Sequence, residues 1–181
     1  MIEVYVSGLA FDTISNAPVV LLKERDGERI LPIWIGPNEA GLIALELSGM
    51  TYKRPLTHDL LKAILNGFNA RLQKVVVSAL NENTFYAKFY ILASENEIIE
   101  IDARPSDSIT MALKMKSPIY VSEELEDSLV ELSPTDEEGP EDGEFDEDMQ
   151  EEENEEDFLA KMDLRKRLRN IKPEDFGNYN L

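Results

Sequence analysis

The amino-acid sequence predicts an α+β fold, in which a strand-rich sheet of mixed or antiparallel strands packs against three main helices. The first observation is that residues 1–132 contain many short segments in which apolar and polar side chains alternate, the pattern of half-buried strands. The second is that three segments with helical spacing interrupt these strands, each between residues that favour helix ends. Strands that outnumber the helices and largely follow one another are typical of α+β proteins.

A first strand and a hairpin are predicted near the N-terminus. The first strand places three apolar side chains on one face: Ile2, Val4 and Val6. The next two strands are predicted at 19–25 and 30–36, on either side of Asp26-Gly27. Because Asp-Gly readily adopts the positive φ angles of a tight hairpin turn, these two strands are expected to pair antiparallel.

Proline, glycine and capping residues predict where the helices begin and end. Pro37 suits the first position of a helix that stops at Gly49. Thr57 is a favourable N-cap for a second helix, and Ser106 for a third helix that ends before Pro118. The second helix is expected to carry one apolar stripe, made of Leu60, Leu61, Ile64 and Leu65.

Three consecutive strands are predicted after the second helix, at 72–80, 84–92 and 97–102. Because only short polar segments connect them, they are expected to form an antiparallel meander. After the third helix, 118–121 predicts a short strand and 123–129 a short helix. These elements complete the predicted core domain.

Charge divides the chain into three parts. The 181 residues include 37 acidic and 18 basic side chains, a net charge of −19. Residues 1–132 hold 19 acidic and 12 basic residues, whereas residues 133–157 hold 15 acidic residues and no Lys or Arg. The second part is predicted to be a disordered acidic linker, because it has too few apolar residues to form a core. Residues 158–181, with six basic residues, predict a short basic amphipathic helix and a tail.

Composition excludes several kinds of site. The chain has no Cys, which excludes disulfides, thiolate nucleophiles and cysteine-ligated metals, and its one histidine, His58, excludes a multi-histidine metal site within the chain. No Gly is followed by Lys and no two glycines are spaced as in G-x-G, so the common phosphate-binding loops are absent. With neither a bilayer-spanning apolar segment nor a signal peptide, a soluble, cytoplasmic protein without membrane contact is expected.

The dipeptide Arg-Pro occurs twice, each time shortly before a predicted helix. Arg54-Pro55 precedes the second helix and Arg104-Pro105 precedes the third. Proline keeps the preceding residue out of helical geometry, so each guanidinium is expected near the free N–H groups at a helix N-terminus. Such a place suits a phosphate or another anion.

Five motifs stand in order along residues 1–130: LPIWIG at 31–36, KRPLTHDLL at 53–61, TFYAKF at 84–89, IDARPSDSI at 101–109 and SPIYV at 117–121. Together they resemble the bifunctional nuclease family, also called the DNase/RNase domain family. The segment Pro-Glu-Asp-Phe at 173–176 is similar to the ending of some members. The resemblance implies cleavage of DNA and RNA.

Arg104, Arg54 and His58 are the candidate catalytic residues. Arg104 stands between a strand end and a helix start, where it is suited to position a phosphate or else to form an ion pair with Asp102 or Asp107. Arg54 has the same two interpretations, with a solvated basic corner as the plainer one. His58 is the only side chain whose unperturbed pKa lies near neutrality, so it is the natural general acid or base, and the alternative is a packed structural histidine.

Asp59, Asp102 and Asp107 are the candidate ligands for Mg²⁺ or Mn²⁺, which bind carboxylates together with substrate phosphates. This metal site requires the three side chains to converge. Asp59 and Asp107 are also expected in the first turn of a helix for structural reasons, since the helix dipole favours an acid there. Glu39, near the start of the first helix, is a weaker candidate of the same kind.

Aromatic residues offer stacking surfaces for bases at Trp34, Phe85, Tyr86, Phe89 and Tyr90. Alternation along the strand puts the two Phe residues on one face and the two Tyr residues on the other. At least one set is expected in the core or in a subunit interface, and a homodimer is therefore expected.

Two functions follow from these observations. The first is a nuclease, a hydrolase that cleaves the phosphodiester bonds of DNA, RNA or both with a divalent metal and low sequence specificity. The second is a non-catalytic, dimeric regulatory or assembly protein, in which the polar motifs maintain the fold. The acidic linker and the net charge of −7 in residues 1–132 argue against tight nucleic-acid binding. The linker is either a solubilising segment or a nucleic-acid mimic that competes with substrate.

Overall fold

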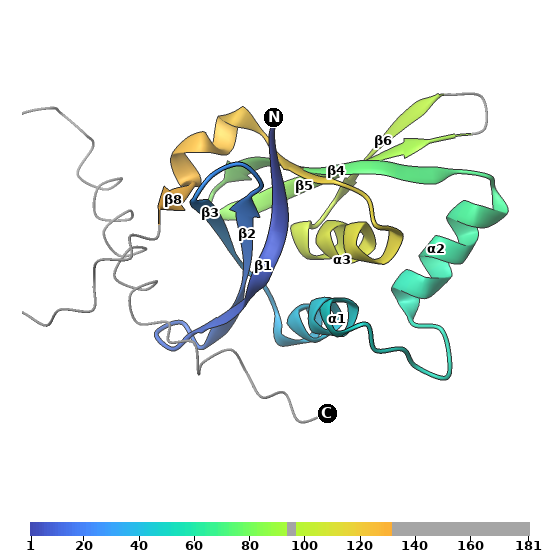
Figure 1. Cartoon of the computed structure of the whole chain (residues 1–181), viewed down its shortest axis with the longest axis horizontal. Helices are drawn as coiled ribbons and strands as arrows, with labels where there is room; N and C mark the ends of the chain where they lie inside the picture. The colour runs from blue at the N-terminus through green and yellow to red at the C-terminus, as the bar shows by residue number, and fades with distance from the viewer. Residues whose placement is uncertain (94–96, 132–181) are drawn as a thin grey trace, which may run out of the picture.

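The computed structural model describes residues 1–93 and 97–131, which form one eight-stranded sheet covered by helices (Figure 1). The strands are β1 (Ile2–Asp12), β2 (Ala17–Glu24), β3 (Arg29–Trp34), β4 (Arg71–Asn81), β5 (Thr84–Leu92), β6 (Ile98–Ala103), β7 (Ile119–Val121) and β8 (Val130–Glu131). The helices are α1 (Pro37–Ser48), α2 (Thr57–Gly67), α3 (Pro105–Met115) and the 3₁₀ helix η1 (Glu123–Ser128). The predicted linker at 133–157 and the basic helix predicted within 158–181 lie outside the described residues.

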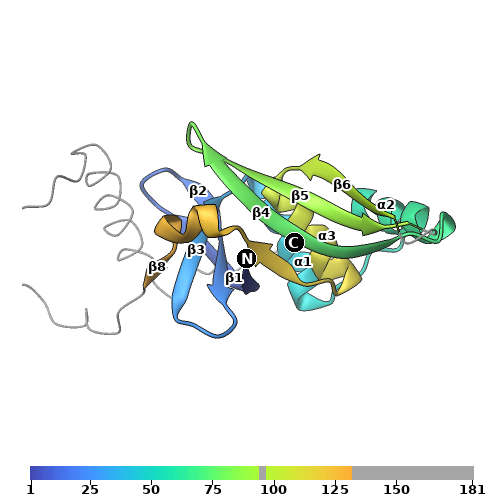
Figure 2. The same ribbon diagram turned by 90° about the horizontal axis from the view of Figure 1, so that it is seen from above.

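The sheet joins two antiparallel meanders in the order β6-β5-β4-β7-β1-β2-β3-β8. β1, β2 and β3 form the first meander, and β4, β5 and β6 form the second. β7 lies between them, antiparallel to β1 and parallel to β4. The sheet is therefore mixed, which confirms the predicted α+β class, and Figure 2 shows that the two meanders run in different directions.

Most predicted elements are present. β2 and β3 pair antiparallel as predicted, but residues 25–28 connect them and neither Asp26 nor Gly27 has a positive φ, so the predicted tight Asp-Gly turn is wrong. α1 begins at Pro37 and ends before Gly49, whose φ of 68° is the left-handed conformation that glycine favours. The predicted meander is confirmed as β4, β5 and β6. β8 is not predicted from the sequence, because two residues are too few for a periodic signal.

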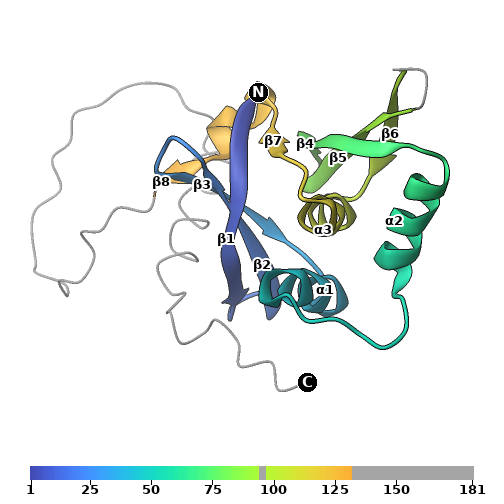
Figure 3. The ribbon, with the colours of Figure 1, turned by 45° about the vertical axis from the view of Figure 1, so that its right-hand side comes forward.

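α3 is the central helix of the fold. It contacts α1 and α2 as well as β4 and β5, and Figure 3 shows it between the sheet and the other two helices. Its side chains Ile109 and Met111 are fully buried and belong to one core cluster with Val75 and Val77 of β4. Only Arg104 separates the last residue of β6 from the first residue of α3, so the sheet positions the start of this helix.

The start of α3 differs from the prediction by one residue. The helix begins at Pro105, and its N-cap is Arg104 in an extended conformation. Ser106 is therefore inside the helix, so the prediction that it is the N-cap is wrong. The physical reason is that proline suits the first helical position, where its fixed φ is compatible and its missing N–H has no intrahelical partner to lose.

The start of α2 is also shifted. Its N-cap is Leu56, and Thr57 is the first helical residue instead of the predicted N-cap. The Asp59 carboxylate accepts a hydrogen bond of 2.9 Å from the Leu56 backbone N–H, which replaces the expected contribution of the threonine side chain. Arg54 consequently lies two residues before this N-cap, whereas the other Arg-Pro pair places its arginine at the N-cap itself.

The predicted apolar stripe of α2 is only partly buried. Leu61 and Leu65 pack against the core, whereas Leu60 and Ile64 are exposed. α2 packs against α3 and β4, so the described part of the chain covers one side of the helix and leaves half of the stripe on the surface.

A lysine with little exposure connects the three helices. Lys114 of α3, whose side chain is 11% exposed, has its Nζ 2.5 Å from Glu46 Oε1 of α1 and 2.6 Å from Asp59 Oδ1 of α2. Lys62 of α2 donates a hydrogen bond of 3.2 Å to the Lys114 carbonyl oxygen. These contacts set the position of the first turn of α2 relative to α3.

Candidate functional site

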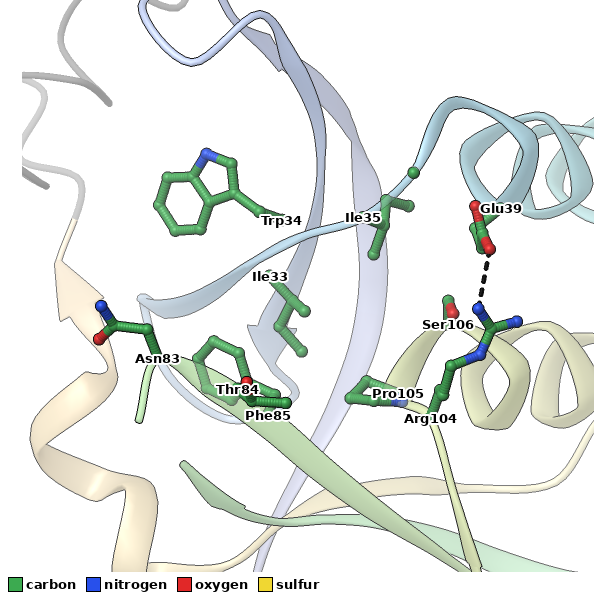
Figure 4. A pocket seen from close by; sticks show the side chains of 11 residues that line it. Ile33, Trp34, Ile35, Glu39, Asn83, Thr84, Phe85, Arg104, Pro105 and Ser106 are labelled. Carbon is green, nitrogen blue, oxygen red and sulfur yellow. Dashed lines mark hydrogen bonds and ion pairs between the residues drawn. The ribbon is translucent and has the colours of Figure 1, made fainter. Parts of the chain in front are cut away.

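A pocket of about 290 Å³ lies where four parts of the chain meet (Figure 4). The end of β3 and the segment after it supply one wall, and the tip of the β4–β5 hairpin supplies another. The first turns of α1 and α3 close the polar end, where Glu39, Arg104 and Ser106 line the pocket. Segments from distant parts of the sequence thus share one hollow.

Arg104 is the central polar side chain of this pocket. Its Nε donates to Asp107 Oδ2 at 2.8 Å, its Nη2 to Asp107 Oδ1 at 3.2 Å and its Nη1 to Glu39 Oε1 at 3.0 Å. The side chain nevertheless remains 65% exposed. Three of the five guanidinium N–H donors are used by described residues, which leaves two for a ligand.

Asp107 is held by two partners. Besides the bonds from Arg104, its Oδ1 lies 3.3 Å from His58 Nε2 of α2. Burial alone would raise the pKa of the Asp107 carboxyl, but the Arg104 guanidinium and His58 outweigh that effect and hold this pKa below its usual value. Asp107 is therefore an ionised anchor that keeps the guanidinium in place.

His58 lies behind the site and not in it. Its side chain is only 10% exposed, and it is absent from the pocket lining. Its Nδ1 is buried and has no hydrogen-bond partner among the residues that the structure describes. The imidazole can therefore position Asp107, but it does not face the pocket as the predicted general acid or base would.

The Glu39 carboxylate lies between the Arg104 guanidinium and Gly36. Its Oε1 accepts the bond from Arg104, and its Oε2 lies so close to Gly36 that a Cβ added there would be 2.3 Å away. Gly36 is the N-cap of α1, directly after the end of β3. The absence of a side chain at Gly36 thus allows the Glu39 carboxylate to fold back toward the helix start and meet the guanidinium.

Trp34 is fixed by a buried carboxylate that sequence reasoning missed. Asp12, at 1% exposure, accepts a hydrogen bond of 2.9 Å from Trp34 Nε1 through Oδ2, and its Oδ1 accepts another of 2.9 Å from the Ile14 N–H. The bond to the residue two positions ahead is the Asx-turn pattern of an aspartate that ends a strand. That local pattern is the only signal in the sequence, because Trp34 is 22 residues away.

Comparison with known proteins places the pocket within a recognised domain. A family model described as the bifunctional nuclease domain matches residues 20–131, a range that contains every residue lining the pocket. The chain belongs to the bifunctional nuclease domain family. This confirms the resemblance seen in the motifs. Asp12 lies before the matched range.

Relatives of this bifunctional nuclease domain occur in bacteria and plants. An uncharacterized protein of Mycobacterium tuberculosis is 46% identical over 121 residues, which cover 67% of this chain and 71% of that protein. Bifunctional nuclease 1 of Oryza sativa subsp. japonica is 24% identical over 113 residues, covering 61% of this chain and 34% of that protein. Bifunctional nuclease 2 of Arabidopsis thaliana is 25% identical over 109 residues, covering 59% and 33%.

Of the three predicted catalytic residues of this domain, the pocket contains one. Arg104 lines it, and His58 supports it through Asp107. Arg54 is exposed in the segment between α1 and α2 and does not line the pocket. The two Arg-Pro pairs therefore do not form a matched pair of phosphate sites in this structure.

The three predicted metal ligands do not converge. Asp59 is bound to Lys114, Asp107 is bound to Arg104, and Asp102 stands on the edge strand β6 opposite Lys88 of β5. Within residues 1–93 and 97–131 no group of three or more His, Asp or Glu residues is arranged to hold a metal ion. The prediction required convergence, so its donor set does not fit a preformed Mg²⁺ or Mn²⁺ site. The physical reason is that a different cation neutralises each helix-start aspartate.

Two carboxylates of the bifunctional nuclease domain do meet at the pocket, but they meet around an arginine. Glu39 and Asp107 both bond to Arg104, so neither is free to bind a divalent cation in this arrangement.

Across the described part of the chain, no helix has both the length and the apolar character needed to cross a membrane.

Proposed function

We propose that this domain is a nuclease that cleaves phosphodiester bonds of DNA and RNA with low sequence specificity at the Arg104 pocket. The observation that carries the proposal is the Arg104 guanidinium, which Asp107 and Glu39 hold in place at the pocket while the side chain remains 65% exposed. A fixed arginine with two unused N–H donors suits the oxygens of a phosphodiester. Family membership supports nucleic acid as the source of that phosphate.

The residues at the pocket have different roles in the proposed hydrolysis. Arg104 binds the phosphate and stabilises the charge that develops on its oxygens, assisted by the free backbone N–H groups in the first turn of α3. Glu39 accepts a proton from the attacking water, whose oxygen bonds to phosphorus while the bond from phosphorus to the leaving oxygen breaks. The leaving oxygen takes up a proton from solvent water. Asp107 and His58 act as positioning residues, because both lie behind the guanidinium.

The alternative, a non-catalytic regulatory or assembly protein, is supported by one observation. The ion pairs of Arg104 connect the first turns of α1 and α3, as a purely structural network would. In that case the exposure of the guanidinium has no ligand to explain it. In both functions Asp107 holds the Arg104 guanidinium in place. The two differ only in whether a substrate binds to Arg104.

The test is cleavage of labelled single-stranded RNA and double-stranded DNA by the full chain, purified in parallel with its Arg104→Ala variant. Each reaction is run with Mg²⁺, with Mn²⁺ and with EDTA. The predicted dependence on a divalent metal is retained as a proposal, and the EDTA reaction decides it. Equal cleavage by both proteins would identify a contaminant and remove the nuclease proposal.

Replacing Gly36 by alanine is expected to lower cleavage by about 10- to 100-fold, the range for a misplaced catalytic group. The new Cβ would lie 2.3 Å from Glu39 Oε2, which is too close, and that flexible carboxylate would swing away from Arg104. The free energy of unfolding is expected to change by less than about 1 kcal/mol, because only the far end of a side chain moves. Cleavage kinetics and urea unfolding of the same sample give both values.

Gly41→Ala is the matched control for that substitution. Gly41 lies inside α1, and a Cβ added there meets nothing within 4 Å. The variant is expected to keep full cleavage and to gain roughly 0.5–1 kcal/mol in stability from the better helix propensity of alanine. If Gly36→Ala cleaves as well as Gly41→Ala, Glu39 has no part in the reaction.

We also propose that the domain forms a homodimer through β6. This strand is the edge of the sheet among the described residues, and Ile98, Ile99 and Ile101 on it are exposed. An apolar edge strand pairs readily with its own copy, and antiparallel pairing about a two-fold axis gives a closed dimer. Light scattering should give twice the chain mass for the wild type and the single-chain mass for Ile101→Lys. The control Ile14→Lys changes an exposed residue in a turn and should also give twice the chain mass. A monomeric wild type would contradict the proposal.

A further inference from the structure

The pocket has an apolar part that the proposed cleavage reaction does not use. Arg104, Glu39 and Ser106 form its polar end, whereas Ile33, Ile35 and Phe85 line the other side (Figure 4). Binding a phosphate needs only the polar end. An apolar wall within the same pocket is therefore suited to the part of a nucleotide that is not phosphate.

Trp34 borders the pocket at the end of β3, but its indole packs on the opposite face of this strand from Ile33. The indole N–H, its one polar group, already donates to the buried Asp12 carboxylate. The ring also packs against a small core cluster that includes Val19 and Ile30. The indole therefore fixes the end of β3, and the apolar surface that a ligand can contact comes from Ile33, Ile35 and Phe85.

Phe85 reaches the pocket from the β4–β5 hairpin, across the pocket from the end of β3. It lies on the inner face of β5, on the same face as the buried Phe89, but it is only half-buried because it sits where the core opens into the pocket. Tyr86 lies on the other face of the strand and is 42% exposed. The predicted alternation of the aromatic residues thus leaves Phe85 at the pocket, while Phe89 belongs to the core.

The hairpin tip adds a polar group at the rim. Glu82 and Asn83 have φ angles of 47° and 59°, the conformation of a tight two-residue turn, and this turn brings Asn83 and Thr84 to the lining of the pocket. An asparagine amide carries both donors and an acceptor, which match the mixed donors and acceptors along the edge of a base.

We propose, resting on the nuclease function above, that this apolar wall is a subsite for one unpaired nucleobase beside the bound phosphate. Its volume of about 290 Å³ is near the lower limit of roughly 300 Å³ for small-molecule sites, so the pocket admits one nucleotide and not a duplex. A base enters such a pocket only when it is unstacked and unpaired. The domain therefore selects single-stranded DNA or RNA at this position.

The experiment measures binding in EDTA, and each oligonucleotide is run on a gel after the titration to verify that it is intact. A fluorescent six-residue oligothymidylate, the same sugar-phosphate chain with abasic residues, and a DNA duplex are titrated with the full chain, and affinity is read from fluorescence anisotropy. The base-bearing single strand is expected to bind about tenfold more tightly than the abasic strand, the effect of one base–aromatic contact. The duplex is expected to bind no better than the abasic strand.

Two variants locate the subsite. Phe85→Ala is expected to abolish the preference for the base-bearing strand, whereas Tyr86→Ala, on the opposite face of the same strand, keeps it. Asn83→Gly, which retains the turn because glycine accepts positive φ, is expected to reduce that preference even if Phe85→Ala fails to fold. Equal binding of the base-bearing and abasic strands, no measurable binding of either, or an unchanged preference in both pocket variants overturns the subsite. A base preference without cleavage in Mg²⁺ or Mn²⁺ would support the subsite and reject the nuclease.

Discussion

Replacing Arg104 by alanine is expected to lower the rate of cleavage by about 10²- to 10³-fold, the usual effect of removing one group that stabilises developing charge. The loss is large because Arg104 is the only cation among the described residues that line the pocket, and these residues use only three of its five N–H donors. The effect on folding is expected to be about 1 kcal/mol or less, because the guanidinium is mostly exposed.

Arg25→Ala is the matched control for Arg104. Arg25 is also an exposed arginine, at 60%, and its Nε lies 2.8 Å from Glu3 Oε1. Its removal is expected to leave cleavage unchanged, so a fall in both variants would indicate a general effect of lost positive charge on nucleic-acid binding. Arg104→Lys is expected to recover only part of the activity, because a lysine cannot provide the forked donors that now engage Asp107 and Glu39 together.

Replacing Lys114 by alanine is expected to lower the free energy of unfolding by about 2–4 kcal/mol, slightly less than the 3–5 kcal/mol known for fully buried pairs. The substitution would leave the carboxylates of Glu46 and Asp59 facing one another without a cation, and Asp59 is partly solvated. Urea unfolding followed by circular dichroism measures the loss. Cleavage is also expected to fall, since the same contact positions the first turn of α2, which carries His58.

The stability difference between the wild type and Lys114→Ala depends on pH because two pKa values shift in opposite directions. The hydrogen bond from Lys114 holds the pKa of Asp59 below its ordinary 3.8, so its contribution to stability is present above that value and is lost as pH falls through the folded-state pKa. Burial alone would lower the pKa of Lys114, but Asp59 and Glu46 raise it above 10.5, so its contribution is complete below 10.5 and is lost at more alkaline pH. The difference between wild type and variant should therefore be largest between about pH 5 and 10.

Lys88→Ala is the control for Lys114→Ala. The Lys88 ammonium lies 3.2 Å from Glu100 Oε2 on the sheet surface, where both side chains are about half exposed. Its removal is expected to lower stability by about 1 kcal/mol or less. A similar small loss for Lys114→Ala would show that the three helices are held by apolar packing alone.

Much of the fold is predictable because its signals are local. The Pro37 helix start and the left-handed Gly49 both act through backbone dihedral preferences that a few neighbouring residues decide. The errors at Thr57 and Ser106 are also local, since proline and aspartate compete with the hydroxyl residues for the helix start.

Arg104 can be identified as a candidate from the sequence, but its site cannot. One partner, Asp107, is three residues away and within reach of the same helix turn. The other, Glu39, is 65 residues away and depends on Gly36 to reach the guanidinium. The sequence favours Arg104 over Arg54 only because Arg104 stands directly between a strand end and a helix start, since both arginines precede a proline.

The sequence by itself thus determines the family, the α+β class and most element boundaries, because alternation, capping and turn residues act over a few positions. Only the tertiary structure decides that Asp59 pairs with Lys114, that Asp107 pairs with Arg104 and that His58 lies behind the pocket. These assignments depend on how three helices pack on a twisted sheet, which brings together charges that are far apart in the chain. A carboxylate at a helix start looks the same in sequence whichever cation the packing places beside it.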